Sequence, residues 1–198
     1  EEVLKQIDKC APIANALTKQ VVMKVGTEPL SQVLDFAADK FADAITAREL
    51  IELAGGMEDG ETFKSYLPGG ASGGILPASL ADLPLDFGSL DKYGSFVGSH
   101  AIVVFSERDD VADIVINLLR FFKDESCGQC TPCRVGTRLM LELLERLYSG
   151  EGQPDDLRQI ERLGSIIQRG SLCGLGQAAP NAILSSLRHF RAEFEAHL

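Results

Sequence analysis

The sequence predicts an α+β fold in which a small region of strands and short helices precedes a bundle of four helices. Short β-branched and aromatic runs at Phe63–Leu67 and His100–Ser106 predict strands. Beyond residue 107, apolar residues recur at three- and four-residue spacing through four successive segments, which predicts amphipathic helices. With 45% hydrophobic and 24% charged residues, the 198-residue chain can bury a core. We therefore place one domain at residues 1–106 and a second at residues 107–198.

Composition excludes several classes of function. A formal net charge of −10 argues against sequence-independent nucleic-acid binding, which depends on neutralising phosphates with Lys and Arg. No apolar run approaches the roughly 18 residues of a membrane span, and no basic segment followed by an apolar one opens the chain. Five cysteines, four of them in a cluster-like spacing, suit a reducing compartment better than a disulfide framework. We expect a cytoplasmic protein; its Glu-Glu start is compatible with a fragment or a processed product.

The first 61 residues predict a mixture of short elements. A short helix breaks near Pro12, and a strand follows at Val21–Val25. Apolar spacing predicts a helix over Pro29–Ala42, and Cys10 is interpreted as a lone, buried, hydrophobic side chain. A further helix is expected to begin at a capping box in which Thr46 is the N-cap and Glu49 its partner. Gly55-Gly56 should end that helix.

Residues 62–106 change character at a glycine-rich loop. The strand Phe63–Leu67 runs into LPGGASGG, which is interpreted as a structural turn, with a loop facing a partner or a ligand as the alternative. The following stretch is rich in Pro, Gly and Asp and should wrap a surface. The strand His100–Ser106 is predicted to be central and buried, because it is β-branched and apolar. His100 is interpreted as a strand-edge residue rather than a catalytic one.

The second domain is predicted to be an up-down bundle. Asp109-Asp110 should cap its first helix and Asp155-Asp156 should start its third, while Gly150–Pro154 forms a loop. Pro180 should lie in the first turn of the fourth helix. The four apolar stripes are Val111, Ile114, Val115, Leu118 and Phe122; Leu139, Met140, Leu143, Leu144 and Leu147; Leu157, Ile160, Leu163, Ile166 and Ile167; and Ile183, Leu184, Leu187, Phe190 and Phe194.

A run of closely spaced cysteines lies between the first two predicted helices. Cys127, Cys130 and Cys133 follow a C-x2-C-x2-C spacing, and Cys173 lies 40 positions further on in SLCGLG. Thiolates at such a spacing can converge on one inorganic centre, so we expect these four sulfurs to hold a [4Fe-4S] cluster. Thr131 and Pro132 are expected to be N-cap and first residue of the second helix, which places Cys133 beside unpaired backbone N–H groups.

Neighbouring residues are expected to tune this centre. Gly174 and Gly176 should let N–H groups point at cluster sulfurs, because glycine permits close approach of the backbone. Arg134 either adds positive charge to the centre or forms a salt bridge. The competing interpretation is a zinc site of the same four cysteines, but zinc favours two separated C-x2-C pairs. A thioredoxin-like redox pair lacks its βαβ context, and no histidine lies near a cysteine in sequence to support a cysteine nucleophile.

The motif ESCGQCTPCRVGT closely resembles the C-terminal part of the NADH-binding flavoprotein subunits of respiratory complex I and of NAD(P)-linked hydrogenases and formate dehydrogenases. The resemblance covers roughly residues 46–198, and the ending CGLGQ…APN…ILSSLRHFRAEFEAHL is similar to the hydrogenase and formate dehydrogenase members. It implies Cys127, Cys130, Cys133 and Cys173 as ligands of a [4Fe-4S] cluster in a helical bundle. It also implies that the stretch LPGGASGGILP…GSHAIVVF belongs to a β-grasp (SLBB) domain, beginning at about residue 46.

The sequence departs from this family at its N-terminal side. The family binds FMN and NADH through a domain with a GRGGAGFPTG-like loop, and no such loop occurs in these 198 residues. We therefore assign no FMN- or NAD(P)-binding residue and no catalytic residue, although both cofactors are expected in the assembled complex. The chain is either a fragment of a longer polypeptide or a truncated relative.

The function predicted from these features is electron relay. The [4Fe-4S] cluster would pass electrons between a flavin, reduced by or reducing NAD(P), and further iron–sulfur centres. Its expected partners are the flavin-bearing and the 2Fe-2S- or 4Fe-4S-bearing subunits of an oxidoreductase, and neither nucleic acid nor direct membrane insertion is expected. One alternative is a non-catalytic docking module with a purely structural metal. A self-sufficient NADH-oxidising flavoenzyme is a third class, which predicts bound FMN.

Overall fold

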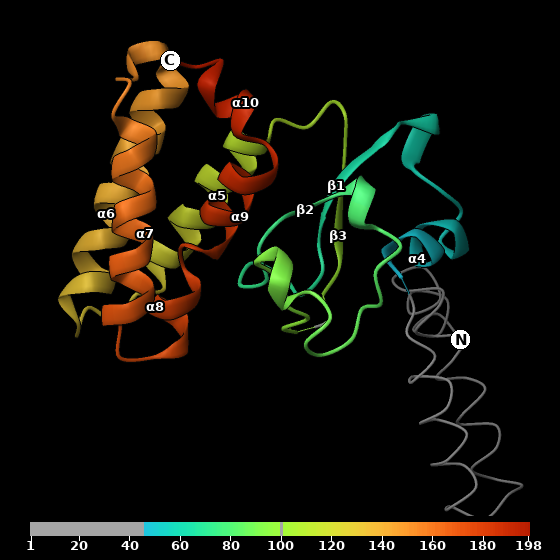
Figure 1. Cartoon of the computed structure of the whole chain (residues 1–198), viewed down its shortest axis with the longest axis horizontal. Helices are drawn as coiled ribbons and strands as arrows, with labels where there is room; N and C mark the ends of the chain where they lie inside the picture. Colours follow the sequence, from blue (N-terminus) through green and yellow to red (C-terminus); the bar gives the residue numbers. More distant parts are fainter. Residues whose placement is uncertain (1–45, 100) are drawn as a thin grey trace, which may run out of the picture.

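The computed structural model describes residues 46–99 and 101–198. The predictions for Cys10, Val21–Val25, Pro29–Ala42 and His100 lie outside these residues. Figure 1 shows two neighbouring parts, a small sheet with its loops and a bundle of helices, which confirms the predicted α+β class. The exact division at residues 106 and 107 stays a prediction.

Helix α4 (Ala47–Leu53) begins and ends as the sequence predicts. Thr46 is the N-cap, and its side chain accepts a hydrogen bond from the backbone N–H of Glu49, while the Glu49 carboxylate accepts one from the backbone N–H of Thr46 at 2.9 Å. This reciprocal pair satisfies two donors that the helix leaves unpaired. After Ala54, Gly55 and Gly56 have φ values of +102° and +92°, a conformation that glycine adopts without strain.

Among the described residues, the sheet has three antiparallel strands in the order β2-β1-β3. Strand β1 (Phe63–Leu67) lies in the middle, with Ser65 opposite Pro77 of β2 (Leu76–Pro77) and Tyr66 opposite Val104 of β3 (Val103–Ser106). The loops around the sheet contain three short 3-10 helices, η1 (Glu58–Gly60), η2 (Ala78–Leu80) and η3 (Asp91–Tyr93). The buried hydroxyl of Tyr66 donates to the Leu80 carbonyl at 3.0 Å, which ties β1 to η2.

The prediction that the third strand is central and buried is wrong for the described residues. Strand β3 is the last strand of the sheet there, and Val103 and Val104 are 42% and 39% exposed. An apolar, β-branched run shows that a segment favours a strand, but its place in the sheet depends on which distant segments pair with it. The central position belongs to β1 instead.

In the described chain from residue 111 onward, six α-helices and one π-helical turn form the second part. They are α5 (Val111–Asp124), α6 (Thr131–Arg146), η4 (Leu147–Glu151), α7 (Asp156–Gly170), α8 (Gly174–Ala178), α9 (Asn181–His189) and α10 (Arg191–Glu195). The fourth predicted helix is thus two short ones, α9 and α10, and the predicted loop at Cys173 contains the short helix α8. Pro180, predicted in the first turn, is the N-cap of α9, and the break lies at Phe190, which has the non-helical angles φ −130° and ψ 27°.

The predicted starts of α5 and α7 are confirmed. The Asp110 carboxylate accepts a hydrogen bond from the Ala112 N–H at 2.7 Å and so caps α5. At the start of α7, the fully buried Asp156 pairs with Arg146 at the end of α6 and accepts a hydrogen bond from the Gln153 N–H at 2.9 Å. This buried carboxylate replaces a simple surface cap and fixes the turn between α6 and α7.

Among the described residues, one cluster of buried apolar side chains spans the bundle and part of the sheet region. It runs through α5, α6, α7 and α9 and includes Leu67 and Ile75. A second cluster, with Tyr66, Leu76 and Leu90, lies within the sheet region. The N–H of Ile75 donates to the Ser185 hydroxyl of α9 at 2.8 Å. Lys64 of β1 forms a salt bridge with Glu193 of α10, with its Nζ 2.9 Å from Oε2. The two parts are therefore packed on each other by apolar contacts and by polar links across the boundary.

Candidate iron–sulfur centre

The loop between α5 and α6 folds back on the first turn of α6. Gly128 turns it with a φ of +76°. The Ser126 hydroxyl accepts a hydrogen bond from the Gly128 N–H and lies 3.3 Å from the Cys133 sulfur. Arg134 donates from Nη1 to the Gly128 carbonyl at 2.6 Å, so its guanidinium holds this loop. The partner that the structure gives Arg134 is thus a backbone carbonyl. Its expected electrostatic effect on the centre stays a prediction.

Cysteines occupy defined positions at the start of α6. Cys130 is the N-cap, and Thr131 and Pro132 are the first two residues of the helix, so the predicted N-cap at Thr131 is one residue too late. The extended backbone of Cys130 already supplies the geometry of an N-cap, and its carbonyl accepts a hydrogen bond from the Arg134 N–H at 3.0 Å. Cys133 lies in the first turn, as predicted, and is only 5% exposed.

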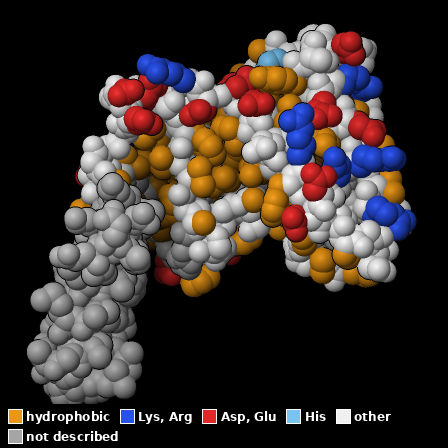
Figure 2. All heavy atoms as spheres, turned by 180° about the vertical axis from the view of Figure 1, so that it is seen from behind, with side chains coloured by type: hydrophobic (Ala, Val, Ile, Leu, Met, Phe, Trp, Pro, Cys, Tyr) orange, Lys and Arg blue, Asp and Glu red, His pale blue; other side chains and the backbone are white. Residues whose placement is uncertain are grey.

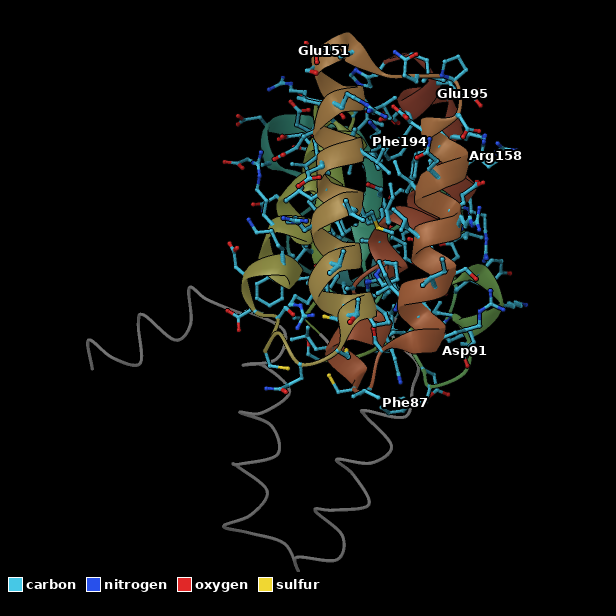
Figure 3. The ribbon with its side chains drawn as sticks, turned by 90° about the vertical axis from the view of Figure 1, so that its left-hand side faces the viewer. Phe87, Asp91, Glu151, Arg158, Phe194 and Glu195 are labelled. Carbon is cyan, nitrogen blue, oxygen red and sulfur yellow. The ribbon has the colours of Figure 1, made fainter. Side chains whose placement is uncertain are left out.

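The fourth cysteine lies in the link between α7 and α8. Ser171 has an extended backbone directly after α7, and Cys173 is the N-cap of α8. The Gln177 side chain donates to the Ser171 carbonyl at 3.1 Å, which closes this link as a compact turn. The sequence therefore places two cysteines, Cys130 and Cys173, directly before helices that begin at the same end of the bundle. Figure 3 shows side-chain sulfur atoms gathered at that end.

Two glycines allow the two cysteine segments to touch. A Cβ on Gly176 would lie 2.6 Å from the Ser171 Cβ, closer than real Cβ atoms approach, and 3.0 Å from the Cys133 Cβ, which is tighter than most real contacts. A Cβ on Gly170 would lie 2.9 Å from Cγ of Pro132. The link that carries Cys173 thus lies directly against the first turn of α6. From the sequence, Gly176 was expected to let N–H groups point at cluster sulfurs. The structure gives it a different role, as a close packing contact between the two segments.

Backbone N–H groups favour the thiolate form of Cys130. Hydrogen bonds from the N–H groups of Leu172 and Cys133 lower the pKa of the Cys130 thiol, and the Ser171 side chain acts in the same direction. Leu172 adjoins Cys173, so the lowered pKa also reports how close the two cysteine segments are. Thiolates are the form in which cysteine binds iron, so this environment suits a metal ligand.

The four thiols differ in their exposure to solvent. All four are free; Cys127 and Cys173 are exposed, Cys130 is half-buried and Cys133 is buried. Within residues 46–99 and 101–198, no three His, Cys, Asp or Glu side chains converge as a group that could hold a metal ion. An all-thiol set of ligands fits the soft iron of an iron–sulfur cluster.

The glycine-rich loop has a structural explanation. A Cβ on Gly69 would lie 2.1 Å from the Gly98 nitrogen, and one on Gly73 would lie 2.7 Å from the Phe96 carbonyl. Gly74 has a φ of +81° and is packed against Gly94, since a Cβ there would lie 2.8 Å from its carbonyl. Side chains at these positions would push two loops apart. Of the two interpretations of this loop, the contacts therefore favour the structural turn.

Comparison with known proteins agrees with an iron–sulfur site. Residues 113–197 match the family model described as the NADH-ubiquinone oxidoreductase-F iron-sulfur binding region. That span includes Cys127, Cys130, Cys133 and Cys173. The helical fold, with cysteines directly before α6 and α8, and the family match thus define an iron–sulfur-binding domain of the [4Fe-4S] type. The chain carries the iron–sulfur binding region of this family, and its relatives are subunits of oxidoreductases. FMN and NAD belong to the wider subunit family.

Individual relatives come from two kinds of oxidoreductase. The chain is 42% identical over 155 residues to the NADP-reducing hydrogenase subunit HndC of Solidesulfovibrio fructosivorans, and the match covers 78% of this chain and 32% of that protein. It is 40% identical over 153 residues to an NADH-quinone oxidoreductase subunit from Escherichia coli, covering 76% of this chain and 34% of that protein. The chain therefore spans about a third of the length of these relatives.

Solved structures give the same result. The crystal structure of an NAD+-reducing [NiFe]-hydrogenase in the air-oxidized state superposes with a TM-score of 0.70 and 31% sequence identity. The match covers 78% of this chain and 26% of the hydrogenase chain. Among the described residues, no helix combines the length and the apolar character needed to cross a bilayer.

Proposed function

We propose that this chain is an electron-transfer module that holds one [4Fe-4S] cluster through Cys127, Cys130, Cys133 and Cys173. The observation that carries the proposal is the packing of Gly176 on Cys133, which brings the link with Cys173 against the three-cysteine segment. Cys133 and Gly176 are 43 positions apart in the sequence (176 − 133) and are in contact in the structure. Contact of this kind is what a shared centre requires of two distant segments.

The residues around the thiols have separable roles. Cys133 supplies a buried, nearly water-free thiol at the base of the site, and the Ser126 hydroxyl can donate to its sulfur at 3.3 Å. The N–H groups of Leu172 and Cys133 stabilise negative charge on the Cys130 sulfur. Arg134 keeps the Cys127 loop folded over the helix start through the Gly128 carbonyl. When bound, the cluster supplies one-electron redox chemistry, and hydrogen bonds to its sulfurs set its potential.

The relatives support a place for this module in a larger oxidoreductase. Their names describe an NADP-reducing hydrogenase subunit and NADH-quinone oxidoreductase subunits. We infer that the module exchanges electrons with a flavin, reduced by or reducing NAD(P), and with further iron–sulfur centres on partner subunits. A reducing compartment such as the cytoplasm suits four free thiols and an oxygen-sensitive centre.

Anaerobic reconstitution with iron and sulfide tests the proposal on the full chain. We expect about four iron atoms per chain, a brown chromophore and an EPR signal of a reduced [4Fe-4S] cluster after dithionite. Cys130→Ser should abolish the signal, while Cys10→Ser, outside the family region, should leave it unchanged. A colourless protein that retains one zinc per chain would contradict the relay and favour a structural metal within a docking module. Bound FMN and reduction of ferricyanide by NADH would instead indicate a complete flavoenzyme.

A further inference from the structure

Ser171 carries a buried hydroxyl that has no hydrogen-bond partner among the described residues. The residue directly follows α7, is 5% exposed, and is one of three in the described chain with such a hydroxyl. The other two, Ser65 and Ser186, lie in β1 and α9. Most buried hydroxyls in folded proteins are paired, because burying one without a partner costs free energy. Ser171 differs from the other two in its position, two residues before Cys173.

The backbone of Ser171 is held on both sides. Its N–H donates to the Ile167 carbonyl at 3.0 Å, and its carbonyl accepts a hydrogen bond from the Gln177 side chain at 3.1 Å. A Cβ on Gly176 would lie 2.6 Å from both Cβ and Oγ of Ser171 and 3.0 Å from the Cβ of Cys133. These contacts place the Ser171 hydroxyl beside the first turn of α6.

The same hydroxyl lies close to the Cys130 thiol. The pKa of that thiol is lowered chiefly by the N–H groups of Leu172 and Cys133, and in smaller part by the Ser171 side chain. Within the described part of the chain, however, the hydroxyl forms no hydrogen bond of ordinary geometry with this sulfur. Cysteine binds iron as a thiolate, and an anionic sulfur is a stronger acceptor than a thiol. Ser171 therefore lies beside an acceptor that becomes stronger when Cys130 binds iron.

We propose that Ser171 donates a hydrogen bond to the Cys130 sulfur in the cluster-bound chain and thereby raises the reduction potential of the cluster. This inference rests on the proposed function. Reduction adds negative charge to the cluster and its ligands, and a hydroxyl that points at a ligand sulfur stabilises that charge. The Ser126 hydroxyl lies 3.3 Å from a different sulfur, that of Cys133, so the two serines act on separate ligands.

Paired charges on the surface of the bundle have less influence on this potential. Figure 2 shows Lys and Arg side chains beside Asp and Glu side chains over the bundle. Arg191, for example, forms ion pairs with Glu161 at 2.7 Å and with Glu195 at 2.9 Å. The fields of paired, exposed charges largely cancel, and salt screens them over about 10 Å at 0.1 M ionic strength. A buried donor beside a ligand sulfur is screened much less.

Potentiometric titration of the reconstituted full chain, followed by EPR, tests this role. Ser171→Ala should still bind about four iron atoms per chain. Its equilibrium constant for one-electron reduction should fall at least about threefold, which corresponds to about 28 mV towards a lower potential. Ser65→Ala, which removes a similar buried hydroxyl from the sheet, is the matched control and should keep the wild-type potential. Electron–nuclear double resonance in H2O and D2O should show one exchangeable proton coupling fewer in Ser171→Ala.

The contrary outcomes are distinct. A loaded Ser171→Ala chain with the wild-type potential and proton couplings would overturn this inference and leave the proposed function intact. A wild-type chain that binds no [4Fe-4S] cluster would overturn the proposed function, and this inference with it. If Ser171→Ala folds but holds no cluster, the Ser126→Ala chain decides, since it lacks the hydroxyl near the Cys133 sulfur. A rapidly exchanging coupled proton is expected in that chain, and its absence overturns the inference.

Discussion

Gly176 lies directly against Cys133, since a Cβ added at residue 176 would be 3.0 Å from the Cβ of that cysteine. The contact joins α8 to the first turn of α6 and sets the separation between the two cysteine segments. A methyl group at residue 176 would clash with the Cβ atoms of Cys133 and Ser171. Because a Cβ atom is bonded directly to the backbone, rotating a side chain cannot remove this clash.

Gly176→Ala should weaken both the fold and the metal site. Overpacking at this contact is expected to lower the free energy of unfolding by about 1–3 kcal/mol and to reduce the iron bound per chain. Gly174→Ala is the matched control in the same short helix, because a Cβ there meets nothing within 4 Å. Iron content and urea unfolding of both variants measure the effect. Equal iron content in the two variants would refute the link between this contact and the site.

Lys64 connects the sheet to the end of the bundle. Its Nζ donates to the Asp109 carbonyl at 2.7 Å and to Glu193 at 2.9 Å, and its side chain is only 11% exposed. Lys64→Met removes both bonds and should cost about 1–2 kcal/mol of unfolding free energy. Arg108→Met, at a pair whose guanidinium is 78% exposed, should cost less than about 0.5 kcal/mol. Chemical denaturation measures both, and equal losses would contradict this ranking.

The buried Asp156 should matter far more than its neighbour Asp155. The Asp156 side chain is fully buried and pairs with Arg146, which is 41% exposed. Asp156→Asn leaves Arg146 without its carboxylate partner and should lower the free energy of unfolding by about 1–3 kcal/mol. This is less than breaking a fully buried ion pair costs, because water reaches the arginine. Asp155→Asn disrupts only an exposed ion pair with Arg158 and should change the free energy of unfolding by less than about 0.5 kcal/mol. Urea unfolding at neutral pH compares them, and similar values would disprove the expectation.

Alkaline pH should destabilise the sheet region through Tyr66. Burial, with a smaller contribution from Asp82, raises the pKa of Tyr66 to about 12 from the usual 10.0. Because the folded-state pKa is raised, the stabilisation is fully present below pH 10 and is lost as pH rises towards 12. The free energy of unfolding should therefore fall by on the order of 1 kcal/mol per pH unit across that window.

Tyr66→Phe is expected to remove this pH dependence at a cost of about 1 kcal/mol at neutral pH, since the Leu80 carbonyl loses its donor. Tyr148→Phe is the control, because Tyr148 is 40% exposed. Unfolding curves at pH 8 and 11, with tyrosinate absorbance, provide the measurement. A Tyr66→Phe variant that retains the wild-type pH dependence would show that another group is responsible.

Local signals predicted the parts of the fold that depend on neighbours in sequence. The capping box of Thr46 and Glu49, the cap at Asp110 and the placement of Cys133 in a first turn all follow from contacts within a few residues. The cysteine spacing predicted the iron–sulfur class that the family comparison supports. Such features need little knowledge of the tertiary structure.

Features that depend on distant residues were not predictable in the same way. The edge position of β3 results from its pairing with β1 alone in the described sheet. The contact between Gly176 and Cys133 depends on how α8 packs against α6. The break at Phe190 was missed because its apolar spacing continues the helical pattern although its backbone leaves it. Periodicity reports which face is apolar, but not whether the backbone stays helical.

The hydrogen bond from the Ile75 N–H to the Ser185 hydroxyl has a consequence for synthesis on the ribosome. These residues are 110 positions apart, so the partner of Ile75 is translated well after β1 and β2. Contacts between residues far apart in sequence slow folding. In the nascent chain, Ile75 and Leu67 therefore stay exposed to solvent until α9, which packs in the same cluster, has been synthesised. During that interval a chaperone or a neighbouring nascent chain can bind the apolar surface. The yield of folded protein should thus depend on how quickly residues 76–185 are translated.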